Sequence, residues 1–330
     1  MAGINRLSSV TRGKSFTAMR IKYGSFSVLG GSSTAVAVAG YFGGGYGGSN
    51  ISGIDKITFP ADTKTTLSAT LTTARSSPTG MANSSIAGYF GGGDDGSTIS
   101  GIDKITFPAD TKTTLSATLT NAVYGPFGMA NSSVAGYFGG GYTGAARVSN
   151  IDKITFPADT KTTIAATMTT AANIVAGMAN SGVAGYLCGG DAPSATDRVD
   201  KITFPADTKT TLSAVLTNAT AGAGAMANSG VAGYVAGGQG AARISTIDKI
   251  TFPADTKTTL SATLSSATNN LENGMANSSI AGYFGGGSTA AGRVSTIDKI
   301  TFPADTKTTL SATLTTARAD VAGFADSGAI

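Results

Sequence analysis

The stretch AGYFGGGDDGSTISGIDKITFPADTKTTLSATLTNAVYGPFGMANSS, residues 87–133, decides the fold because the chain repeats it almost letter for letter. Its most constant part, IDKITFPADTKTT, begins at Ile54, Ile102, Ile151, Ile247 and Ile297, and a sixth copy begins at Val199. In chain order these starts are 48, 49, 48, 48 and 50 residues apart. A fixed period of this length is typical of proteins in which every repeat forms one structural unit.

Each repeat has the pattern of β structure. Glycine makes up 46 of the 330 residues, too many for helices, and no window keeps a helical period. We expect four short strands per repeat: A (GMANS), B (AGYFGGG), C (IDKITF) and D (TTLSATL). Strand D is expected because Leu67, Ala69 and Leu71 alternate with polar residues. The intervening Pro-Ala-Asp-Thr segment suits a hairpin between strands C and D.

Six such repeats predict an all-β fold, a six-bladed β-propeller of four-stranded antiparallel blades over residues 33–330. The C-terminal segment 323–330, GFADSGAI, matches strand A alone, while residues 33–45 supply strand B of the first repeat. We therefore expect the strand in 323–330 to complete the first blade and close the ring, which removes exposed sheet edges. A β-solenoid or an open array is the alternative.

The repeat resembles the kelch unit. The resemblance rests on the diglycine that ends strand B, the Asp-Thr turn after strand C, and a basic residue after strand D in two copies, Arg75 and Arg318. The kelch tryptophan is replaced by Thr or Leu, and four copies lack the closing arginine. The near-identity of the copies and the phrasing AGYFGGG…IDKITF also resemble repeat proteins of marine and cyanobacterial phages. These resemblances imply a propeller that binds a partner.

The composition argues against most catalytic chemistry. The sequence has no histidine, which excludes histidine-based triads and histidine metal sites, and Glu272 is its only glutamate. The lone Cys188 replaces a strand B residue and is expected to be a buried, inert thiol. We expect no cofactor, no metal site and no enzyme activity. No signal peptide and no membrane-spanning run is recognisable.

The first 32 residues differ from the repeats. They carry Arg6, Arg12, Lys14, Arg20 and Lys22, and no acidic residue precedes Asp55. The charges of the repeats themselves cancel, so this basic, Ser/Gly-rich arm contributes five of the 23 basic residues behind the net charge of +4. We expect residues 1–32 to anchor or dock the chain on another protein, with nucleic acid as a weaker alternative.

The connections between strands divide into two kinds. The A–B and C–D connections hardly vary, whereas the B–C and D–A connections differ in every repeat. Antiparallel strands place the two kinds on opposite faces, so one face should be regular and the other varied. Loops on a rigid scaffold often carry binding residues, although tolerant loops vary as well. The candidate contact residues on the varied face are Tyr46, Asp94, Asp95, Tyr124, Phe127, Tyr142, Arg147, Arg198, Arg243 and Arg293.

Three functional classes remain. The first is a non-enzymatic phage virion protein, such as a tail, fibre or capsid appendage, made in the host cytoplasm. Its arm would bind other virion proteins and its varied face a host-surface glycan or protein, and it could form homo-oligomers. The second is a carbohydrate-active propeller enzyme using loop carboxylates, among which Asp94, Asp95, Asp191 and Asp197 are available. The third is an intracellular kelch-like adaptor.

Overall fold

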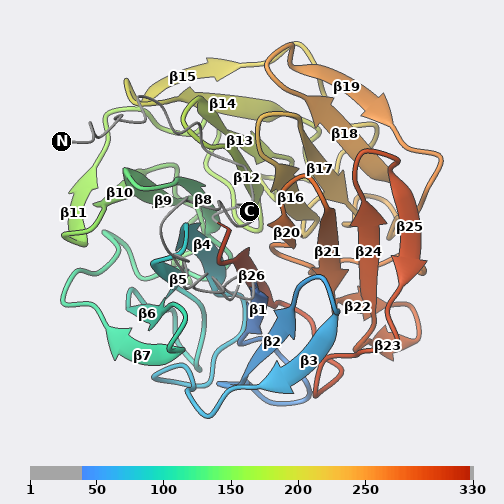
Figure 1. The fold of residues 1–330 in the computed structure, drawn as a ribbon. Coiled ribbons are helices and arrows are strands. Elements are labelled where there is room, and N and C mark those ends of the chain that lie inside the picture. The colour runs from blue at the N-terminus through green and yellow to red at the C-terminus, as the bar shows by residue number, and fades with distance from the viewer. Residues whose placement is uncertain (1–38, 328–330) are drawn as a thin grey trace, which may run out of the picture. The chain divides into compact units, whose positions relative to one another are not determined.

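The computed structural model describes residues 39–327, and these form six four-stranded antiparallel sheets arranged as the blades of a propeller (Figure 1). Strand A of each blade lies nearest the axis and strand D lies at the rim. Each pleated strand uses only three to five residues. The predicted fold class is therefore confirmed, and no helix in residues 39–327 could cross a membrane.

The blades follow the chain, except that the first blade is completed from its end. Blade 1 contains β26 (Ala322–Ala325), β1 (Ala39–Gly43), β2 (Ile54–Thr58) and β3 (Thr63–Thr66). Blades 2 to 4 are β4 (Thr79–Asn83), β5 (Ala87–Gly91), β6 (Ile102–Thr106), β7 (Thr111–Thr114); β8 (Phe127–Asn131), β9 (Ala135–Gly139), β10 (Ile151–Thr155), β11 (Thr160–Thr163); and β12 (Ala176–Asn180), β13 (Ala184–Cys188), β14 (Val199–Thr203), β15 (Thr208–Thr211). Blades 5 and 6 are β16 (Gly224–Asn228), β17 (Ala232–Ala236), β18 (Ile247–Thr251), β19 (Thr256–Thr259); and β20 (Met275–Asn277), β21 (Ala281–Gly285), β24 (Ile297–Thr301), β25 (Thr306–Thr309). A small hairpin, β22 (Ser288–Thr289) and β23 (Gly292–Arg293), lies in the B–C connection of blade 6.

The ring closes as the sequence predicts. Strand β26 pairs antiparallel with β1, from Gly40 opposite Ala325 to Gly43 opposite Ala322. The closing strand thus covers only the first part of the predicted segment 323–330. The arm at 1–32, its boundary at residue 33 and residues 328–330 lie outside the described residues.

Strand D differs from the prediction. It covers Thr63–Thr66, and the alternating segment Leu67–Leu71 that suggested it lies outside the ladder. In that segment the N–H of Leu67 donates to Ile54 O, and the N–H of Leu71 donates to Ser52 O, four residues later. The segment therefore follows the edge of its own blade with widely spaced bonds. Apolar and polar residues alternate in this segment because one side of it packs against the blade, although the segment does not pair as a strand.

The most constant residues of the repeat form contacts between neighbouring blades. Tyr41 of blade 1 stacks on Phe107 of blade 2, with ring centroids 5.2 Å apart, and its hydroxyl donates to Asp110 Oδ1 at 2.7 Å. Lys56, opposite Tyr41 on β2, donates to Asp110 Oδ2 at 2.7 Å. The same clamp recurs at all six junctions, including the one from blade 6 to blade 1. The residues that are identical in all copies therefore hold adjacent blades together.

The aspartate of strand C makes a second bond between blades. Asp103 in β6 is buried and accepts hydrogen bonds from the backbone N–H of Thr72 at 2.9 Å, from the Thr72 hydroxyl, and from the Thr114 hydroxyl. Thr72 belongs to the segment that leaves blade 1, so the carboxylate joins two blades. The other five junctions repeat this arrangement, with Ser265 in place of threonine at one of them.

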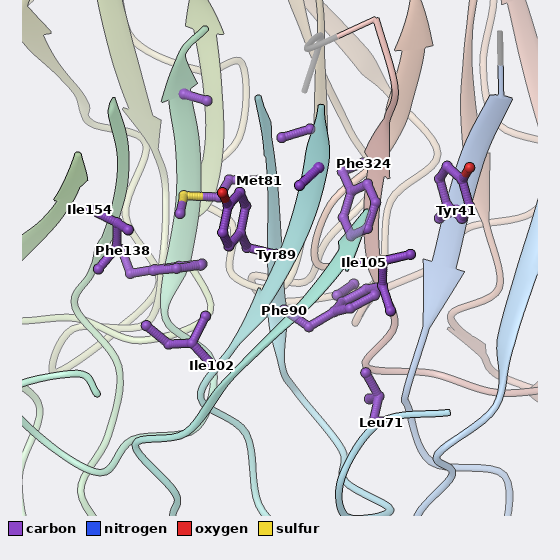
Figure 2. Close-up of a cluster of buried hydrophobic side chains, with 14 of the residues drawn as sticks. Tyr41, Leu71, Met81, Tyr89, Phe90, Ile102, Ile105, Phe138, Ile154 and Phe324 are labelled. Atoms are coloured by element: carbon purple, nitrogen blue, oxygen red, sulfur yellow. The ribbon is translucent and has the colours of Figure 1, made fainter. Parts of the chain in front are cut away.

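The apolar core runs between the blades near the axis. The strand A methionine of one blade packs on the Gly-Tyr glycine of the next, as Met81 does on Gly136. In the closing strand Phe324 takes the methionine's place and packs on Gly88 and on the ring of Phe90, at a centroid distance of 4.6 Å (Figure 2). One cluster thereby includes side chains of blades 1, 2 and 3.

Candidate binding face

The connections lie on two faces of the propeller, as their sequence variation predicts. On one face an A–B connection meets a C–D connection, where Phe107 N donates to Ile86 O. On the other face a B–C connection meets a D–A connection, where Tyr46 forms a β-bridge with Ala319. We name the first the regular face and the second the varied face.

A ring of β-bridges organises the varied face. In every blade the residue after the strand B glycines pairs with the D–A connection of the preceding blade through two backbone hydrogen bonds. Three of the predicted contact residues, Tyr46, Asp94 and Tyr142, occupy this position, and a fourth, Tyr124, is the bridge partner of Tyr142. The rings of Tyr124 and Tyr142 lie 5.6 Å apart. The structure thus places these side chains on fixed backbone positions.

The predicted arginines also lie on this face. Arg147 pairs with Asp191 of the next blade, and the Arg293 guanidinium lies over the Tyr46 ring of the next blade, 4.3 Å from its centroid. Arg243 Nε donates to Asn269 Oδ1, in the connection that leaves its own blade, at 2.8 Å. These three arginines are therefore partly committed to the fold.

Phe127 is a wrong candidate. It is the first residue of β8 and its side chain is 0 % exposed. Strand A begins one residue earlier than the predicted GMANS segment, which moves Phe127 out of the varied connection and into the core. There its ring packs against Gly139 of the neighbouring strand β9. Asp95, in contrast, is exposed as predicted.

A groove of about 440 Å³ lies between blades 1 and 2. It is formed by the segment that leaves blade 1, the B–C connection of blade 2 and the segment that leaves blade 2. Its lining residues are Thr72, Thr73, Arg75, Asp95, Thr98, Ile99, Ser100, Gly101, Asp103, Thr114, Thr118 and Ala122. Of the predicted contact residues only Asp95 lies in this groove.

The groove is open because Gly101 has no side chain. A Cβ built on Gly101 would meet nothing within 4 Å. At the same repeat position blade 3 has Asn150, which accepts a bond from Asn121 at 2.7 Å, and blade 4 has Arg198, which donates to Thr170 at 2.7 Å. Side chains cross these two junctions, and the spaces beside them hold only about 10 and 20 Å³.

Arg75 forms the buried floor of the groove. Its side chain is 2 % exposed, and Nη2 donates to Asp103 Oδ2 at 2.9 Å and to Phe90 O at 3.3 Å. Burial alone would raise the pKa of Asp103, but the hydrogen bonds from Thr72 and the charge of Arg75 outweigh it and hold this pKa below its usual value. The carboxylate is therefore a fixed anion. The groove offers hydroxyl groups, one free carboxylate and a short apolar wall at Ile99.

Arg75 and Gly101 are site residues that the sequence reasoning missed. A signal was present within the chain: the two arginines in the segments after strand D, Arg75 and Arg318, both face a glycine, Gly101 and Gly53, whereas the four other junctions have neither. A long side chain from one side of a junction requires space on the other. Comparing these two positions across the six repeats would have indicated which junctions are unlike the rest.

Other candidate chemistry is limited. In residues 39–327 no group of three or more Asp, Glu or Cys side chains is arranged to hold a metal ion. Cys188 is fully buried, and burial raises the pKa of its thiol well above the usual value. The anchor residues Arg6, Arg12, Lys14, Arg20 and Lys22 lie outside the described residues.

Comparison with known proteins identifies the architecture. No protein-family model and no curated protein matches the sequence. Among solved structures, the protein described as "Structure of YjhT" superimposes with a TM-score of 0.64 and 16 % sequence identity, covering 82 % of this chain and 96 % of that one. At this identity the likeness concerns the fold, so the six-bladed propeller is the conclusion that both the structure and the comparison support.

Proposed function

We propose that the chain is a non-enzymatic, kelch-like binding propeller of a phage virion, and that its varied face binds a glycan of the host surface. The observation that carries the binding proposal is the groove of about 440 Å³ beside Gly101, which is far larger than the spaces of about 10 and 20 Å³ at the next two junctions. A volume of this size suits a small ligand or part of a larger one.

The lining of the groove suits a ligand rich in hydroxyl groups. Threonine and serine hydroxyls both donate and accept hydrogen bonds, and the exposed Asp95 adds a strong acceptor. Ile99 and Ala122 provide an apolar wall for the carbon face of a sugar ring. A neutral or cationic oligosaccharide therefore fits this surface better than a phosphate or sulfate ester, which Asp95 would repel.

The carboxylates of the groove favour binding over hydrolysis. Glycoside hydrolysis needs one carboxylic acid that is protonated and one carboxylate that is ionised. Asp103 has a lowered pKa and uses its oxygens to accept bonds from Thr72, Thr114 and Arg75, so it holds no proton to give. Asp95 alone cannot supply both roles. The propeller is therefore proposed to retain its ligand unchanged.

A filled groove tests the proposal. Gly101→Asn introduces the residue that blade 3 has at this position. We expect this variant to lose binding to an array of bacterial surface polysaccharides, and to show no binding in calorimetry with the oligosaccharide that wild type binds best. Gly53→Asn is the matched control at the junction of blades 6 and 1, where a Cβ meets only Ile51 at 3.7 Å, and it should leave binding unchanged. Equal binding by Gly101→Asn and wild type would overturn the assignment of the groove. New reducing ends in the polysaccharide after incubation with the protein would show that the groove hydrolyses its ligand, and would refute the proposal of binding without hydrolysis.

The setting in a virion rests on sequence. The phrasing of the repeats resembles phage repeat proteins, and the basic segment 1–32 suits docking on another virion protein. Mass spectrometry of density-purified particles from the source culture tests this part. We expect the chain at a fixed ratio to capsid or tail proteins, and deletion of residues 1–32 should prevent incorporation. A chain found only in the soluble cell fraction would refute the virion setting, while leaving the groove to be tested separately.

A further inference from the structure

The regular face carries a ring of exposed aliphatic side chains. Six large apolar residues among 39–327 are exposed, and five of them occupy one repeat position, in the A–B connection: Ile86 (46 %), Val134 (45 %), Val183 (41 %), Val231 (47 %) and Ile280 (47 %). The sixth, Val215, lies in the segment after a strand D. Single apolar residues on a surface are ordinary, but the same exposure at one position of five consecutive blades makes a pattern.

The fold uses the backbone of this position and leaves the side chain free. The N–H of Ile86 donates to Asn83 O, and its carbonyl accepts from Phe107 N of the same blade. Equivalent bonds hold Val134, Val183, Val231 and Ile280. A tight turn of this kind is ordinarily occupied by small or polar residues. Nearly half of each β-branched residue remains in solvent, and its repetition at the same position of five blades points to a contact outside the blade.

The surroundings of the ring are also weakly polar and electrically neutral. The C–D turn beside each aliphatic residue exposes a proline and an alanine, as at Pro108 and Ala109. Apart from the buried Asp326 of blade 1, the charges on this face are the lysine and aspartate of the clamp, which pair with each other at 2.6 to 2.7 Å at all six junctions. No excess of one sign remains in the clamp to repel a copy of the same face.

We infer that the regular face is an interface with a second copy of this chain, formed face to face about a two-fold axis. Two-fold symmetry requires a self-complementary patch, and a face that repeats the same neutral, apolar unit in every blade matches its own copy in several blade registers. Each of blades 2 to 6 exposes four residues here and blade 1 exposes Pro60 and Ala61, which gives 22 exposed residues. A standard stable interface uses roughly 20 to 30 residues a side, so the face is large enough.

Sedimentation velocity of the full-length chain over a concentration series tests the inference. We expect wild type to approach 65 kDa, twice the 32.5 kDa of one chain, with little dependence on salt because the contact is apolar. The double variant Val134→Asp/Val183→Asp should be monomeric or raise the dissociation constant by about 10-fold or more, since each buried, unpaired carboxylate appears twice in the dimer. The wild-type side chains are exposed in the monomer, so circular dichroism of the variant should be unchanged.

Val215→Asp is the matched control, because Val215 is equally exposed (42 %) but lies off the regular face. It should dimerise like wild type. A wild-type chain that stays monomeric at every concentration overturns the inference. So does a dimer that the double variant leaves intact, which would place the contact on another surface. Loss of dimer in Val215→Asp as well would mean that the assay reports general solubility, and it would count against the regular face.

Discussion

Replacing Arg318 by alanine should destabilise the propeller more than the same change at Arg75. Both arginines are buried and both pair with a strand C aspartate. Arg75 also donates to one carbonyl, that of Phe90, at 3.3 Å. Arg318 donates to three carbonyls: Gly44 O at 2.8 Å, Gly53 O at 3.2 Å and Phe42 O at 3.2 Å. Arg318 lies at the junction where the last blade meets the first, so its bonds hold the ring closed.

The expected magnitudes follow from these partners. Removing one member of a buried ion pair costs about 3–5 kcal/mol when the other charge is left without partners. Here the aspartate keeps its bonds, because Asp55 still accepts from the Thr315 N–H at 2.9 Å and from the Thr66 hydroxyl at 2.9 Å. We therefore expect a loss of about 2 kcal/mol for Arg75→Ala. Arg318→Ala also leaves the buried Gly44 O without its partner, at about 1 kcal/mol, whereas Gly53 O still accepts from the Gly44 N–H at 3.2 Å; the expected loss is about 3 kcal/mol.

Urea unfolding followed by far-ultraviolet circular dichroism measures both losses, since the chain has no tryptophan to serve as a fluorescent probe. The readout is the free energy of unfolding of each variant relative to wild type. Arg293→Ala serves as control, because Arg293 is exposed and its guanidinium lies over the Tyr46 ring at the surface. Equal losses for Arg75→Ala and Arg318→Ala, or a larger loss for Arg75→Ala, would refute the reasoning that the carbonyl bonds of Arg318 set the difference.

Three further predictions concern single positions. Asp326 stands where other repeats have asparagine, and burial raises its pKa to about 6. The folded state thus binds this proton more tightly than the unfolded one, so the contribution of Asp326 to stability is greatest below about pH 4 and is lost as the pH rises through 6. Asp326→Asn should remove this loss and add about 1–2 kcal/mol near pH 7 in urea unfolding; an unchanged pH profile would contradict the assignment. A Cβ on Gly128 would lie 2.1 Å from Gly80 O. Gly128→Ala should therefore cost about 3 kcal/mol or more, whereas Gly101→Ala should cost less than about 1 kcal/mol, and similar losses would be inconsistent with the close packing of strand A. Cys188 should react with a thiol reagent only on unfolding; rapid labelling of the native chain would show that blades 4 and 5 open.

The ring could be predicted from the sequence because the six repeats are nearly identical and evenly spaced. Strands B and C are nearly right in extent, and the closing strand is recognisable because Gly323 begins a further copy of strand A, while residues 33–45 begin with strand B. Strand D is misplaced because an edge contact buries every second residue of Leu67–Leu71, as a strand would. Phe127 is misplaced because one residue at a strand boundary decides between loop and core. The periodicity of the sequence cannot distinguish a paired strand from an edge contact, or a loop residue from the first residue of a strand.

The groove depends on a different kind of information. Each residue that forms it is ordinary in its own repeat, and the groove brings Arg75 of one blade together with Gly101 of the next. Pairing between blades cannot be read along one repeat, because the partners are about 25 residues apart and belong to different strands. The pairing can be recognised when the same two positions are compared in all six repeats, because the repeats can be aligned with one another as homologous sequences are.

The D–A connections look free to vary, yet their backbone is fixed. Each has a residue with a positive φ, between 46° and 65°, at one position: Ser77, Gly125, Ile174, Gly222, Asn270 and Asp320. Their backbone groups form a closed ring around the axis, in which each connection donates to the preceding one and Leu271 replaces Asn270 as the donor to Gly222 O. Four of these residues are not glycine, and a β-branched residue such as Ile174 is strained in this conformation. The variation on this face therefore changes side chains on a constant backbone. Side-chain variation at fixed backbone positions is what a binding surface needs, so this ring is consistent with the proposal that the varied face binds a partner.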